Sequence, residues 1–214
     1  MIVEQLIDSQ VPTLEIGMSI KDCQVVFEKC TWNSLPVINK TELIGYISRA
    51  QINEVSTPIL MGASFSGLVF YNHQHLYEIY PLMQSAGMDN VAVVSAKGEY
   101  IGVVSSQSIG KCLLNTLTYR GEGSIVLLKI FHTDFILSQL ARIVEENNSK
   151  IVGMMIENID NYYFVNLKIN NLNIGPILQS FQRFAIAVEG HFSSHDAEAL
   201  QKRKFDMALR HFDL

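Results

Sequence analysis

The chain has 214 residues, of which 48% are hydrophobic and 17% charged, and its formal net charge is −5. This composition excludes a disordered chain, because disordered chains have too little apolar surface to bury. The negative net charge also gives no basic excess for binding nucleic acid. No apolar run approaches the roughly 20 residues of a membrane span, and residues 1–10 lack the basic start of a signal peptide. We therefore expect a globular, cytoplasmic protein that binds neither nucleic acid nor membrane.

A helix, a hairpin and a second short helix are predicted within the first 55 residues. Ser19 is a favourable helix N-cap, with Asp22 three residues later imitating a capping box. Two apolar runs, Leu35–Ile38 and Leu43–Ile47, flank a polar turn and predict a pair of antiparallel strands. The stretch Arg49–Val55 predicts a short helix directly after the second strand.

The same order recurs about 57 residues later. A second hairpin is predicted from the runs Val91–Val94 and Tyr100–Val104, with a helix over Ser106–Leu117. Each unit alone is too small to bury a sizeable core, so we expect the two to share one. Residues with helical spacing precede the second hairpin: Leu76, Ile79, Tyr80 and Met83.

Both hairpins carry a recognisable pattern, Leu35-Pro-Val-Ile followed by Leu43-Ile-Gly-Tyr-Ile-Ser48 in the first copy. This pattern resembles the CBS domain, and two in tandem resemble a Bateman module. The resemblance implies a regulatory ligand that contains adenosine (AMP, ADP, ATP or S-adenosylmethionine) in the cleft between the repeats. In the family, a Ser or Thr hydroxyl and an Asp three residues later hold the ribose. Carried onto this sequence, the candidate ligand-binding residues are Ser48, Gln51, Ser105, Ser108, Leu35, Pro36 and Ala92.

The sequence departs from the family pattern at both acidic positions. Gln51 and Ser108 replace the Asp, so each bond to ribose lacks charge assistance and is weaker by about 1 kcal/mol. In the second copy, Ala92 stands where the first has Pro36. The two serines also have a simpler interpretation as caps of the following helices. Two functions stay open: a sensor of an adenosine-containing ligand, and an interaction scaffold that has lost ligand binding.

The second half has a different pattern, introduced by Gly121 and Gly123, which mark a short linker. We expect a first helix capped by Thr133 or Asp134 and a second capped by Asn173. Together with the strands, the order is β-α-β-β-α-β, a ferredoxin-like unit. The expected strands are Ser124–Phe131, Lys150–Ile156, Tyr163–Ile169 and Phe184–Glu189, with a turn at Asp160-Asn161 between the second and third.

This order, with the string Leu137–Asn147 followed by Lys150-Ile151, resembles an ACT domain. The resemblance implies amino-acid binding or the pairing of subunits. Ligand-binding members usually have a glycine just before the first helix, where this chain has Phe135-Ile136. We therefore favour a dimerisation unit, with amino-acid sensing as the alternative.

The remaining sequence, Ser194–Phe212, predicts a helix with an apolar stripe. The expected α+β architecture is thus a tandem CBS pair over residues 1–119, with repeats at about 12–55 and 70–118. An ACT-like ferredoxin-like domain over 123–191 and a C-terminal helix over 192–214 follow. The layout resembles acetoin-utilisation-type and other bacterial CBS–ACT proteins. We expect a homodimer that relays ligand binding through the geometry of the dimer, either to the other subunit or to an unidentified protein partner.

Candidates for catalysis or metal binding are lacking in the sequence. The three cysteines have no metal-ligand spacing, and His73 and His75, the one close histidine pair, are interpreted as part of a solvated loop. No Gly-x-Ser-x-Gly, His-Glu-x-x-His or Gly-rich phosphate loop with lysine is present. We therefore expect no metal site, no catalytic residues and no enzymatic activity.

Overall fold

The computed structural model describes residues 1–54 and 67–193. The chain divides into two compact units, Met1–Leu113 and Leu114–Leu214. This division falls several residues before the glycine linker expected at Gly121 and Gly123, because helix α5 (Leu117–Arg120) packs against a strand of the second unit. The C-terminal helix expected over Ser194–Phe212 lies outside the described residues.

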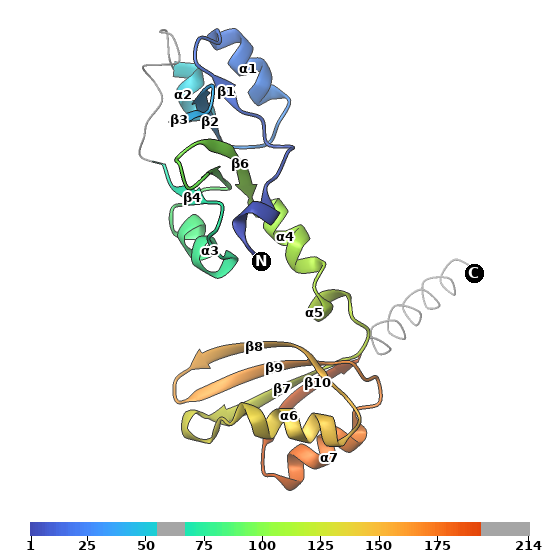
Figure 1. The fold of residues 1–214 in the computed structure, drawn as a ribbon. Helices are drawn as coiled ribbons and strands as arrows, with labels where there is room; N and C mark the ends of the chain where they lie inside the picture. The colour runs from blue at the N-terminus through green and yellow to red at the C-terminus, as the bar shows by residue number, and fades with distance from the viewer. Residues whose placement is uncertain (55–66, 194–214) are drawn as a thin grey trace, which may run out of the picture. The chain divides into compact units, whose positions relative to one another are not determined.

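Two repeats with the same order of elements build the first unit, after a short 3-10 helix, η1 (Val3–Leu6) (Figure 1). Each repeat runs strand, helix, strand, strand, helix, and its three strands form a sheet with one parallel and one antiparallel pairing. Both predicted hairpins are therefore confirmed. The first repeat comprises β1 (Leu14–Glu15), α1 (Ile20–Glu28), β2 (Ser34–Asn39), β3 (Glu42–Ser48) and α2 (Arg49–Glu54). The second comprises β4 (Val69–Tyr71), α3 (Leu76–Ser85), β5 (Asn90–Val94), β6 (Tyr100–Ser105) and α4 (Ser106–Leu114).

A bulge at an equivalent place distorts both hairpins. The register shifts after Val37, which pairs with Gly45, and after Val93, which pairs with Gly102. A glycine inside a strand commonly marks a bulge or a close backbone approach. The single glycine in each second strand, visible in the sequence, thus has the same geometric reason in both repeats.

Helix α3 begins differently from the sequence-based expectation. His75, expected in a solvated loop, is its N-cap, and the ring nitrogen Nδ1 accepts a hydrogen bond from Tyr77 N at 3.2 Å. Three of the four residues predicted on its apolar face are buried, but Tyr80 is 41% exposed. Tyr80 lies at the border of the buried stripe, where a tyrosine keeps its hydroxyl in water.

The two repeats meet through polar bonds and a small apolar cluster. At equivalent positions, Asn33 N donates to Asp89 Oδ2 at 3.2 Å and Asn90 Nδ2 donates to Ser34 O at 2.9 Å. Two buried clusters, one centred on each repeat, take the place of the single shared core expected from the size of each repeat, although the first cluster also includes Val103 of β6. A smaller cluster joins the repeats: Ile38, Leu43, Tyr46 and Ala92.

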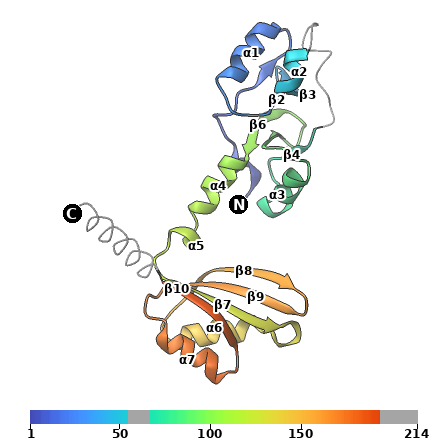
Figure 2. The ribbon, with the colours of Figure 1, turned by 180° about the vertical axis from the view of Figure 1, so that it is seen from behind.

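The second unit is a four-stranded antiparallel sheet with two helices on one face, as both views show (Figures 1 and 2). The strand order β10-β7-β9-β8 confirms the ferredoxin-like arrangement. Its buried core lies between the sheet and the two helices. The elements are β7 (Ser124–Phe131), η3 (His132–Asp134), α6 (Leu137–Glu146), β8 (Ile151–Ile159), β9 (Tyr162–Ile169), α7 (Gly175–Arg183) and β10 (Ala187–Ser193).

Both helix starts predicted in this unit were wrong. Thr133 and Asp134 belong to the 3-10 turn η3, and Ile136 is the N-cap of α6 without a side-chain hydrogen bond. Ile174 takes the same place before α7, one residue after the expected cap Asn173. Both helices begin without a capping side chain. A prediction based on the nearest Ser, Thr, Asp or Asn therefore places each helix start too early.

The last strand of the sheet also begins later than predicted. Phe184 is the C-cap of α7, its N–H donating to Ser180 O at 3.1 Å, and Ala185 has a positive φ of 55°. The chain needs this left-handed turn to reverse from helix to strand, so β10 starts at Ala187. Within the described ranges 1–54 and 67–193, the structure contains no helix long and apolar enough to span a membrane.

Candidate functional site

Ser48 ends β3 and begins the turn into α2, where it exchanges two hydrogen bonds with Gln51. Gln51 N donates to Ser48 Oγ at 3.1 Å, and Ser48 N donates to Gln51 Oε1 at 2.8 Å. This reciprocal pair is the geometry of a capping box. Ser48 therefore caps α2, and the exchange does not use the Nε2 amide of Gln51.

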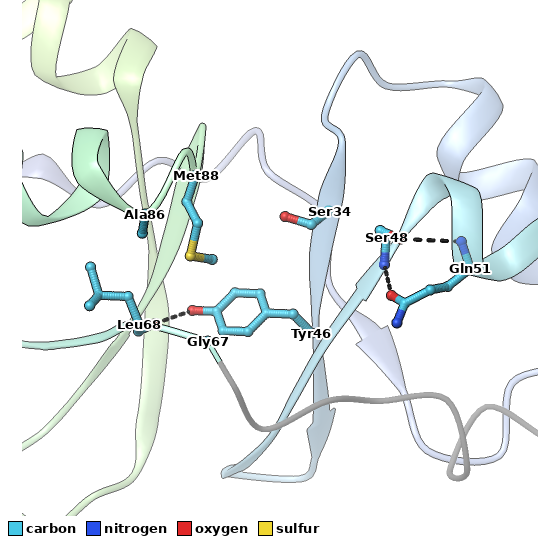
Figure 3. A pocket seen from close by; sticks show the side chains of 8 residues that line it. All are labelled: Ser34, Tyr46, Ser48, Gln51, Gly67, Leu68, Ala86 and Met88. Atoms are coloured by element: carbon cyan, nitrogen blue, oxygen red, sulfur yellow. Dashed lines mark hydrogen bonds between the residues drawn. The ribbon is translucent and has the colours of Figure 1, made fainter.

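The same two residues line a cavity of about 430 Å³ in the first unit. Its wall draws on both repeats, with Ser48 and Gln51 at one side and Leu68 and Met88 at the other (Figure 3). The volume lies within the range of small-molecule sites in proteins, about 300–1,000 Å³. The lining residues are Ser34, Tyr46, Ser48, Gln51, Gly67, Leu68, Ala86 and Met88.

Tyr46 joins the two repeats across this cavity. Its hydroxyl donates to Leu68 O and accepts from Ala92 N, both at 2.7 Å, and the residue is 7% exposed. Burial raises the pKa of Tyr46 to about 12, against the opposing effect of the Ala92 N–H. Tyr46 thus stays a neutral donor at ordinary pH and holds one wall of the cavity in place.

Ser105 and Ser108 repeat the capping geometry at the equivalent turn. Ser108 N donates to Ser105 Oγ at 3.0 Å, and Ser105 N donates to Ser108 Oγ at 3.1 Å. Unlike Ser48, however, Ser105 is fully buried, and its hydroxyl donates to Asp8 Oδ2 at 2.5 Å. The two serines predicted to bind ligand therefore have different surroundings.

Three other candidate residues lie in the core and do not line the cavity. Leu35 and Ala92 are fully buried, and Pro36 is buried within β2, opposite Tyr46. Ala92 acts on the site only through its backbone N–H, which bonds the Tyr46 hydroxyl. The motif places these residues close to the cleft in sequence, but the strand pleat and the pairing of the repeats direct them inward.

Sequence reasoning missed most of the cavity wall. Ser34, Leu68 and the pair Ala86 and Met88 come from three separate segments that meet only when the repeats pack. Tyr46 carried a signal, because a tyrosine within an apolar strand needs a partner for its hydroxyl. In residues 1–54 and 67–193, no group of three or more His, Cys, Asp or Glu side chains could hold a metal ion.

Residues 3–57 match the family model of the CBS domain. Residues 69–114 repeat its order of elements, so that the resemblance to a tandem CBS pair is confirmed. No curated protein matches the sequence.

Several solved structures are similar to part of the chain. Protein MJ1004 from Methanocaldococcus jannaschii is 17% identical, covering 55% of this chain and 62% of its own, with a TM-score of 0.49. This chain therefore spans about three fifths of that protein. A CBS domain pair/ACT domain protein from Thermotoga maritima is 14% identical, covering 53% and 97%, with a TM-score of 0.48. A putative acetoin utilization protein from Vibrio cholerae is 19% identical, covering 54% and 91%, with a TM-score of 0.48.

Proposed function

We propose that this chain is a regulatory sensor that binds an adenosine-containing ligand in the cavity at Ser48 and Gln51. The observation that carries the proposal is the 430 Å³ cavity, whose wall draws on both repeats and includes the serine that the CBS resemblance assigns to the ribose. AMP, ADP, ATP and S-adenosylmethionine are the candidate ligands. No catalytic role is proposed.

The chemistry of the wall suits a nucleoside. Leu68, Met88 and the ring of Tyr46 offer an apolar surface to a flat base, and methionine adapts to irregular shapes. Ser48 and Gln51 supply hydroxyl and amide groups for ribose hydroxyls. The described lining residues carry no charged side chain that could bind a phosphate. The cavity therefore recognises the nucleoside part of the ligand, and the phosphate chain extends toward solvent. We therefore expect AMP, ADP and ATP to bind with affinities within a few-fold of one another.

Regulation would follow from the position of the cavity between the repeats. A ligand that contacts both repeats favours the arrangement in which both contacts are made, by its differential affinity of typically about 1–3 kcal/mol. The polar bonds between Asn33 and Asp89 and between Asn90 and Ser34 belong to the same repeat interface. Ligand binding is thereby linked to the geometry of this interface. A protein partner that binds one arrangement of the repeats more tightly would respond to the ligand.

A thermal-shift screen tests this function. AMP, ADP, ATP, S-adenosylmethionine and the common amino acids would be added at about 1 mM; a ligand at 100 times its Kd adds about 2.7 kcal/mol, a shift of several degrees. Ala86→Phe places a ring at the exposed cavity rim, and Ser85→Phe is the matched control, since Ser85 does not line the cavity.

The proposal expects an adenosine compound to shift the melting temperature of the wild type and of Ser85→Phe, but not of Ala86→Phe. Equal shifts in both variants would place the ligand elsewhere. No shift with any compound would favour the interaction scaffold, and a shift with an amino acid alone would favour sensing by the second unit.

A homodimer is part of the same proposal. The edge strand β8 carries exposed apolar residues, Met155, Ile156 and Ile159, and exposed strand edges favour pairing with another copy. Sedimentation equilibrium should give twice the chain mass of 24.1 kDa. A mass of one chain at micromolar concentration would contradict the dimer.

A further inference from the structure

Asp8 forms hydrogen bonds both to the second repeat and within its own N-terminal segment. Oδ2 accepts the hydrogen bond from Ser105 Oγ at 2.5 Å, and Oδ1 accepts one from Gln10 N at 3.0 Å. Asp8 N donates to Val103 O at 2.7 Å, and the residue is 9% exposed. Both carboxylate oxygens and the backbone N–H therefore have partners inside the protein.

The segment before Asp8 is anchored to the same repeat. Val3 and Leu6 are buried in the core cluster of the second repeat, and Ile7 forms an antiparallel bridge with Val104. The Ile7 side chain covers Gly102, where an added Cβ would lie 2.5 Å from Ile7 Cγ2. These contacts fix the backbone on the N-terminal side of Asp8 and hold its carboxylate against Ser105.

Ser105 is the counterpart of Ser48, since each ends the second hairpin strand of its repeat and caps the next helix. A ligand that reached Ser105 would have to displace Asp8, because the Ser105 hydroxyl is fully buried and already donates to that carboxylate. A buried carboxylate and hydroxyl separated from each other lose strong hydrogen bonds that are hard to replace.

We propose that Asp8 closes the second repeat's ligand site from within the same chain, so that each chain binds one adenosine-containing ligand, at Ser48. The inference rests on the proposed function of the Ser48 cavity. The Asp8 carboxylate then takes the place that a ligand would have at Ser105. The two repeats have the same fold but differ in whether they can bind a ligand.

Calorimetric titration of the full chain with AMP and with S-adenosylmethionine tests the stoichiometry. We expect one equivalent per chain, an affinity at least tenfold weaker in Ser48→Ala, and an affinity within threefold of wild type in Ser105→Ala. Two equivalents per chain, or equal losses in the two variants, would overturn the closure. Two equivalents would instead make the Asp8–Ser105 pair a ribose-binding pair.

A measurement without ligand separates this inference from the proposed function. If neither probe binds, the function proposed for Ser48 fails, and thermal unfolding of Asp8→Ala, Ser105→Ala and the double variant still tests the closure. We expect each single variant to lower the unfolding midpoint by several degrees and the double variant to lower it by clearly less than their sum. Additive shifts would overturn the contact. Asp8→Asn, which keeps the shape, serves if Asp8→Ala does not fold, and Glu4→Ala, exposed in the same segment, is the control.

Discussion

Tyr46 of the first repeat bonds two backbone groups on the side of the second, Leu68 O and Ala92 N. Tyr46→Phe keeps the ring but leaves the Leu68 carbonyl and the Ala92 N–H without the partner they have now. Each buried polar group left unpaired costs about 1–3 kcal/mol, so we expect the free energy of unfolding to fall by about 2–4 kcal/mol. Urea unfolding measures this loss. Tyr77→Phe, at a residue 77% exposed, should change stability by less than about 0.5 kcal/mol; equal effects would contradict the role of Tyr46.

The same tyrosine makes stability sensitive to alkaline pH. Burial raises the pKa of Tyr46 from 10.0 to about 12, and burial, followed by the charge of Tyr46, raises the pKa of Tyr100 as well. The folded protein therefore holds these protons more tightly than the unfolded chain. The resulting stabilisation is complete below about pH 10 and is lost as the pH rises toward 12. Urea unfolding between pH 8 and 11 should show this decline, with a smaller slope in Tyr46→Phe. Identical slopes in the two proteins would rule out Tyr46 as its source.

At the scale of single residues, the sequence located only part of the site. Ser48 and Gln51 were predictable because a local motif fixes them at the end of a strand and the start of a helix. Asp8 could not be found, because its partner Ser105 lies 97 residues away and no local pattern links them. Leu68 and Met88 were hidden for the same reason, since packing of the repeats alone brings them to the cavity.

Among the elements, strand β6 packs against the N-terminal segment at Gly102, where the Ile7 side chain leaves no room for a Cβ atom. Gly102→Ala would bring a methyl group against Ile7, which must shift, and we expect a loss of about 1–3 kcal/mol. Gly110→Ala is the matched control in α4, because nothing lies within 4 Å of its added Cβ. Alanine favours a helix over glycine, so this variant should gain up to about 1 kcal/mol. Unfolding midpoints that move in the same direction would contradict the tight contact between Ile7 and β6.

The elements themselves follow largely from apolar periodicity. Both hairpins and the strand β9 lie where alternating or continuous apolar runs predict them. The starts of α6 and α7 were not predictable from capping residues, because Ile136 and Ile174 hold the cap positions without a side-chain bond. Boundaries of this kind depend on backbone turns that cannot be predicted from the residue type at the cap position.

For the whole molecule, two repeats that resemble a CBS pair precede a ferredoxin-like unit, and we propose one ligand site between the repeats. The order of elements made this architecture predictable, because helical and strand spacing alternate in a distinct way in each half of the chain. The inequality of the two repeats was not predictable. It arises from Asp8, which precedes the first repeat in the chain yet packs in the second.

The most direct test locates the ligand on the full chain by NMR of ¹³C-methyl-labelled methionine. The sequence has eight methionines; Met88 lines the cavity, and Met155 lies on β8 of the second unit. Their signals can be assigned with Met88→Leu and Met155→Leu. The account predicts that AMP or S-adenosylmethionine shifts the Met88 signal in a saturable way and leaves Met155 unchanged. An unchanged Met88 signal, while either compound saturates the protein or shifts other methionines, would contradict the site at Ser48 and Gln51.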